Sequence, residues 1–188
     1  AGAADSLSRL RNQGIQVRFL TNNSSQTSES YIAKLTRMGF EAHGNEVYST
    51  GIGTVAYMRQ YGLSSAFVVG EAGLKNTLTR AEITVTDREP QAVIVGICKA
   101  FSYDLLNQAM QLIRSGATFI ATNTDATYPM EGGLFIPGSG SLVAAVQTCA
   151  EVKPVVIGKP EPFLVEMILR DSGVEPGDAL VVGDRIET

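Results

Sequence analysis

The 188-residue sequence predicts an α/β fold built around a parallel β-sheet. Apolar segments of strand length alternate along the chain with segments of helical period, which is the pattern of α/β structure. Glycine repeatedly follows the helical segments, where it favours helix termination. With 44% hydrophobic and 18% charged residues, the composition is that of a globular protein and excludes disorder as the main description.

The opening of the chain predicts a helix, a strand and a second helix. The first helix is expected to stop near Gly14, and the strand covers residues 15–20. This strand is too apolar to have a solvated face, so we expect it to be buried on both sides. Ser28 is the expected N-cap of the second helix, and Gly39 is its C-terminal glycine.

The remaining elements follow the same alternation. Residues 65–70 and 92–97 have strand character, and Ser102 is placed to cap a helix that ends at Gly116. Further along come a strand at 117–121, a helix at 141–150, a strand at 154–158, a helix around 163–168 and a strand at 179–183.

Charge and residue usage exclude several classes of function. A net charge of −4 and a pI of 5.0 argue against nucleic acid or an anionic membrane as partner, because phosphate binding needs clustered Lys and Arg. No apolar run reaches the length of about 18 residues that a membrane helix needs. The distant Cys98 and Cys149 suit a reduced, cytoplasmic protein, and the single histidine, His43, excludes a zinc site built from several histidines.

Polar turns follow three of the predicted strands. Thr21, Asn22 and Asn23 follow the first, Lys159 follows a later strand, and Asp184 follows the last. Ligands of parallel α/β sheets bind at the carboxyl ends of the strands. A hydroxyl and N–H groups suit phosphate oxygens, the lysine offsets their charge, and a carboxylate can ligate Mg²⁺. Each turn alone could be a helix-capping or strand-ending loop, but together they predict a phosphate site beside a hard metal ion.

These motifs resemble those of the haloacid dehalogenase superfamily, in particular its 4-nitrophenyl, phosphoglycolate and NagD-like phosphatases. The similarity runs along nearly the whole chain and is most specific in TNNSS, GKPEP and GDR. The resemblance implies that Thr21, Asn22, Asn23 and Lys159 bind the substrate phosphate, that Lys159 and Thr21 are catalytic, and that Asp184 binds Mg²⁺.

The resemblance also implies a domain organisation. The stretch between Thr21 and Lys159 is several times longer than the stretch between Lys159 and Asp184, as expected for a family member with a large insertion. A Rossmann-like core would comprise residues 1–48 and 152–188, and an α/β cap domain would comprise residues 49–151. Within the cap, Asn123 and Asp125 of the polar loop 123–133 are the candidate substrate contacts; the alternative is a plain surface hairpin.

The chain departs from the family pattern in its first motif. The family uses an Asp-x-Asp motif, in which one aspartate attacks phosphorus and the other acts as general acid and base, and the 188 residues contain no such motif. The resemblance therefore implies a chain truncated at both ends, with an incomplete core. A smaller departure is Cys98, which stands where the family usually has aspartate and which we interpret as a packed thiol.

The expected function is Mg²⁺-dependent hydrolysis of small phosphomonoesters through an aspartyl-phosphate in the complete protein. The expected partner is a small phosphorylated metabolite, and because relatives often self-associate, a homodimer is compatible with the resemblance. The alternative is a noncatalytic phosphate- or nucleotide-binding module that lacks the nucleophilic aspartate.

Overall fold

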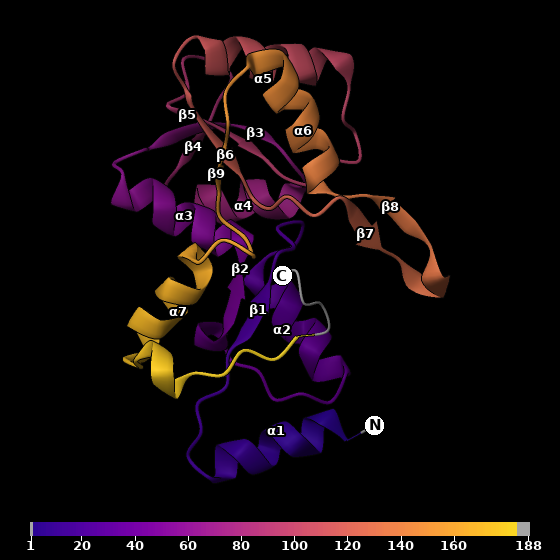
Figure 1. Cartoon of the computed structure of the whole chain (residues 1–188), viewed down its shortest axis with the longest axis vertical. Helices are drawn as coiled ribbons and strands as arrows, with labels where there is room; N and C mark the ends of the chain where they lie inside the picture. Colours follow the sequence, from indigo (N-terminus) through magenta and orange to yellow (C-terminus); the bar gives the residue numbers. More distant parts are fainter. Residues whose placement is uncertain (1, 184–188) are drawn as a thin grey trace.

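The structure is a computed structural model that describes residues 2–183, and it confirms the predicted α/β fold (Figure 1). Within these residues the larger sheet has five strands in the order β4-β3-β5-β6-β9. Each neighbouring pair is parallel, as the strand-helix alternation predicts. The strands are β3 (Ser65–Val69), β4 (Thr84–Val85), β5 (Ala92–Val95), β6 (Thr118–Ala121) and β9 (Val155–Val156).

Helices cover both faces of the larger sheet. Helices α3 (Thr50–Gln60) and α4 (Ala72–Arg80) lie on one face, and α5 (Tyr103–Arg114) and α6 (Ser139–Ala150) lie on the other (Figure 1). A hydrophobic core lies on each face of the sheet, and successive strand residues point into opposite cores. Val68 packs in the cluster that contains α3 and α4 side chains, and Val69 packs in the cluster that contains α5 and α6 side chains. This double coverage explains why the central strands β3, β5 and β6 are mostly apolar.

A smaller parallel sheet pairs β1 (Phe19–Thr21) with β2 (Val47–Ser49). Helices α1 (Ala3–Asn12), α2 (Ser28–Arg37) and α7 (Phe163–Ser172) lie in the same half of the molecule, in the lower part of Figure 1. Leu164 of α7 is fully buried in the core cluster of α3 and α4, so this helix joins the two halves.

An antiparallel hairpin of β7 (Thr127–Pro129) and β8 (Phe135–Pro137) projects from the body of the molecule (Figure 1). Short 3₁₀ helices are η1 (Gly44–Glu46), η2 (Glu131–Gly133) and η3 (Pro176–Asp178). Of the helices that the structure describes, none combines the length and the apolar character needed to cross a bilayer.

Helix-end signals in the sequence are largely confirmed. The Ser102 hydroxyl accepts a hydrogen bond from the Leu105 N–H at 3.2 Å and caps α5 as predicted. Gly116 follows α5 with φ 105°, a conformation that favours glycine. The predicted cap of α2 is wrong by one residue, because Ser28 is the first helical residue and Thr27 occupies the N-cap position.

One strand prediction is wrong in extent, and another is wrong altogether. The strand predicted at residues 15–20 is regular only from Phe19 to Thr21, and its side chains are half-buried because β1 has β2 as its single partner among residues 2–183. The strand predicted at 179–183 is absent from the described sheets. Without a neighbouring strand its backbone joins no ladder, and Leu180 and Val182 are 88% and 85% exposed.

Candidate active site

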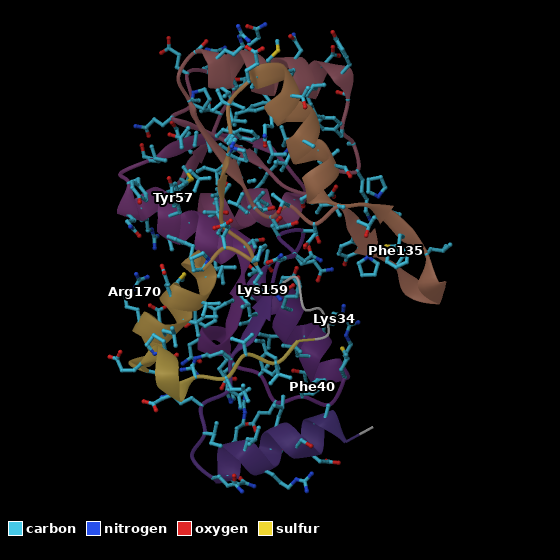
Figure 2. The ribbon with its side chains drawn as sticks, viewed as in Figure 1. Lys34, Phe40, Tyr57, Phe135, Lys159 and Arg170 are labelled. Carbon is cyan, nitrogen blue, oxygen red and sulfur yellow. The ribbon has the colours of Figure 1, made fainter. Side chains whose placement is uncertain are left out.

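Most of the predicted site residues meet in a cleft of about 250 Å³. The predicted residues in it come from three chain segments: the turn after β1, the loop from β6 into the hairpin, and the turn after β9. Lys159 lies near the centre of the view in Figure 2, whereas Phe135 is far out on the hairpin. Six of the seven predicted residues line this cleft, namely Thr21, Asn22, Asn23, Asn123, Asp125 and Lys159. The seventh, Asp184, lies outside the described residues, and the chemical roles of all seven stay predictions.

The turn after β1 is folded by its own side chains. The Asn23 N–H donates to the Thr21 hydroxyl at 3.2 Å, and the Ser25 N–H donates to Asn23 Oδ1 at 2.8 Å. Tyr31 donates to the Asn23 carbonyl at 2.7 Å, and burial raises the pKa of its phenol, so the proton for this bond is retained. Asn23 also donates to the hydroxyl of Tyr128 on β7 at 3.0 Å, which links the turn to the hairpin.

Asn22 connects all three segments of the cleft. Its Oδ1 accepts from the Lys159 N–H at 2.8 Å, and its Nδ2 donates to the Lys159 carbonyl at 3.0 Å and to Asp125 Oδ2 at 3.2 Å. Its backbone carbonyl accepts from Thr50 Oγ1 and from Asn123 Nδ2, both at 2.7 Å. Asn22 is therefore hydrogen-bonded to the loop after β6 and to the turn after β9.

Asn123 is buried beneath the cleft, with 4% of its surface exposed, and its side chain joins several loops by hydrogen bonds. In addition to its bond with Asn22, its Nδ2 donates to Ser139 Oγ at 3.2 Å, and its Oδ1 accepts from the Asp125 N–H at 3.1 Å. Its polar atoms are thus satisfied by the protein, and these contacts favour an architectural role for Asn123. Its predicted contact with substrate stays a prediction.

Glycines permit the close packing of the loops. A Cβ at Gly158 would lie 2.7 Å from both Asn22 Oδ1 and the Thr122 carbonyl. At Gly138 and Gly140 it would collide with the backbone carbonyls of Asp125 and Thr124. The PGSGS segment thus provides a close packing surface for the loop after β6.

Sequence reasoning did not single out Thr50, Tyr128 or Ser139, which hold the site through hydroxyl groups. Tyr128 lies within the predicted substrate loop, and Ser139 lies in the glycine-rich segment before α6. Thr50 and Ser139 each begin a helix, α3 and α6. A hydroxyl residue at such a position gives a weak signal, because it resembles an ordinary helix start.

The described residues do not by themselves form a metal site. Residues 2–183 contain no group of three or more His, Cys, Asp or Glu side chains placed to hold a metal ion. Asp125 is the carboxylate among the residues that line the cleft, and Asn22 donates to it. The cleft therefore offers oxygen donors but no complete ligand set within this part of the chain, and we assign no catalytic step to a metal.

Comparisons with known proteins place this chain in a family. A family model of haloacid dehalogenase-like hydrolases matches residues 1–84, and a second model of HAD-hydrolase-like proteins matches residues 156–188. The acid sugar phosphatase of Staphylococcus saprophyticus is 35% identical over 100% of this chain and 73% of the relative. The ribonucleotide monophosphatase NagD of Escherichia coli K12 is 31% identical over the same shares of the two chains.

A solved structure agrees with these relatives. The p-nitrophenyl phosphatase from Archaeoglobus fulgidus superposes with a TM-score of 0.92 at 28% identity, over 98% of this chain and 71% of that one. The chain belongs to the haloacid dehalogenase-like hydrolase family. Its relatives identify it as a phosphatase of that family.

Proposed function

We propose that the protein hydrolyses phosphomonoesters of small metabolites. The observation that carries this proposal is the placement of Thr21 and Lys159 in one cleft, at the carboxyl ends of β1 and β9. Polar groups at the ends of parallel strands form the usual ligand site of an α/β protein. The phosphatase relatives support the same reaction class.

The two side chains suit a phosphoryl group in different ways. The Thr21 hydroxyl accepts a bond from the Asn23 N–H, so its own proton is available to a phosphate oxygen. The Lys159 ammonium offsets the negative charge of the phosphate. Stabilising the charge spread over the phosphoryl oxygens is the main demand of phosphoryl transfer, and preorganised donors meet that demand.

The proposal includes Mg²⁺ and an aspartyl-phosphate intermediate. Asp184 is the proposed ligand, and a bound Mg²⁺ would neutralise phosphate charge. The attacking aspartate would come from an Asp-x-Asp motif, which the 188 residues do not contain. These two features rest on the family and the sequence motifs.

We further propose that residues 49–151 form the cap and that Asp125 contacts the substrate. The support is the position of the loop after β6, which faces the turn after β1 across the cleft. The substrate would be a small phosphorylated metabolite.

Initial rates with p-nitrophenyl phosphate, measured on the full-length protein with Mg²⁺ and with EDTA, test the proposal. We expect Lys159→Ala to lower kcat/KM by about 100-fold or more, because it removes a preorganised charge from the transferring group. Lys153→Ala is the matched control, because Lys153 is exposed and lies outside the cleft. Equal activity of the two variants would refute the assignment of Lys159.

The noncatalytic alternative predicts a different result. A wild-type protein that binds inorganic phosphate by calorimetry but does not turn over p-nitrophenyl phosphate would support a phosphate-binding module. An intact mass above 20.0 kDa, with Asp-x-Asp in the additional sequence, would support the enzyme.

A further inference from the structure

We infer that the Asn22 side chain is a positioning residue for Lys159 and is not itself a phosphate ligand. This inference rests on the proposed phosphatase function and assigns a new role within that site. Its basis is the way in which Asn22 and the backbone of Lys159 are bonded.

The hydrogen-bonding groups of the Asn22 amide are all engaged. A side-chain amide offers one carbonyl oxygen and two N–H donors. The oxygen accepts from the Lys159 N–H, and the nitrogen donates to the Lys159 carbonyl and to Asp125. The partners also fix the amide orientation, because the opposite one would set the amide oxygen against a carbonyl and a carboxylate.

Two of these bonds hold the N–H and the carbonyl of the same residue. Such a bidentate contact restrains both the position and the rotation of the Lys159 backbone. Strand β9 ends at Val156 and α7 begins at Phe163, so Lys159 lies between regular elements. Asn22 therefore provides the restraint that a longer strand ladder would give.

Asn22 is itself fixed from its other side. Its carbonyl accepts hydrogen bonds from Thr50, which is 0% exposed, and Asn123, which is 4% exposed. A buried network thus sets the position of Asn22, and Asn22 sets the position of Lys159.

The position of the Lys159 backbone matters because the ammonium lies at the end of a long side chain. A rotation of about 10° at Cα moves a group about 6 Å away by about 1 Å, and such a misplacement can cost about 100-fold in rate. If the Asn22 amide bound phosphate, the amide would have to give up hydrogen bonds to Lys159 or Asp125. Each such bond contributes to holding the catalytic lysine.

A double-mutant cycle on the full-length protein separates the two roles. Asn22→Ala, Lys159→Ala and the double variant are compared by kcat/KM for p-nitrophenyl phosphate and by the Kd for inorganic phosphate. We expect Asn22→Ala to lower kcat/KM by about 100-fold in the wild-type background. In the Lys159→Ala background the same substitution should change kcat/KM and Kd by less than about 3-fold, because its effect passes through the lysine.

An equal loss in both backgrounds would overturn the inference, because a direct phosphate ligand or a general folding role acts without Lys159. Urea unfolding identifies variants that fail to fold. If Asn22→Ala does, Asn22→Leu takes its place in the cycle, since it keeps the shape of the side chain and removes the acceptor and both donors without adding a charge.

The proposed function and this inference fail in distinguishable ways. If the wild type binds phosphate without turnover, the proposed function fails, and the cycle in Kd still decides the role of Asn22. A wild type that neither hydrolyses p-nitrophenyl phosphate nor binds phosphate would overturn both.

Discussion

Replacing Gly158 with alanine tests the close packing beneath Lys159. The added Cβ would lie 2.7 Å from Asn22 Oδ1, 2.7 Å from the Thr122 carbonyl and 2.8 Å from Thr50 Cγ2, whereas ordinary contact begins at 3.4 Å. The first two neighbours must each yield by about 0.7 Å, and neither is the free end of a flexible side chain, since one is backbone and the other is bonded to Lys159.

Overpacking of this kind typically costs about 1–3 kcal/mol, which lowers the folding equilibrium constant by about 5- to 150-fold. We also expect kcat/KM to fall, because the strain acts on the contact between Asn22 and Lys159. Urea unfolding and p-nitrophenyl phosphate kinetics measure the two effects. Gly177→Ala is the control, since no atom lies within 4 Å of its added Cβ. If Gly158→Ala matches this control in stability and rate, the packing argument is wrong.

Three further variants test the core, a helix cap and a thiol. Leu164→Ala should lower the free energy of unfolding by about 2–5 kcal/mol because Leu164 is fully buried, and a urea midpoint shift equivalent to less than 1 kcal/mol would contradict its burial. Ser102→Ala should cost about 1 kcal/mol through loss of the cap, whereas Ser102→Asp should retain stability; equal losses would show that the cap contributes little. Burial raises the pKa of the Cys98 thiol, so less of it is thiolate at a given pH. In a Cys149→Ala background, we expect Cys98 to react with iodoacetamide at pH 8 more slowly than glutathione does, and its rate to increase as the pH rises above 8. A rate at pH 8 faster than that of glutathione would refute the raised pKa.

Sequence patterns predicted the sheet well where apolar side chains carry the signal. The strands predicted at 65–70, 92–97 and 117–121 are mostly apolar because helices cover both faces of the sheet. Helix α3 was missed for a related reason. Its buried residues are Thr50, Gly51, Gly53 and Thr54 together with Val55 and Met58, so glycine and threonine occupy most of the buried positions and weaken the apolar helical period.

The sequence predicted which residues line the cleft but not which of them are hydrogen-bonded to each other. The motifs identify Thr21, Asn22 and Lys159 as neighbours, since they follow strands of parallel sheets. They do not reveal which polar atoms are already bonded within the protein. Asn22 and Asn123 resemble ligands in the sequence, yet in the structure their amides hold backbone and side chains from other segments. Such pairings depend on loop packing, which spacing along the chain does not encode.

The choice of asparagine at position 22 follows from its three partners. The Lys159 N–H needs an acceptor, while the Lys159 carbonyl and Asp125 need donors. Aspartate could not donate, and it would place a second negative charge beside Asp125 and the incoming phosphate. Glutamine offers the same groups but is one methylene longer, so from the same backbone position its amide would be displaced from these three partners. A neutral amide of this length therefore orients the lysine while leaving the positive charge of Lys159 to the phosphate.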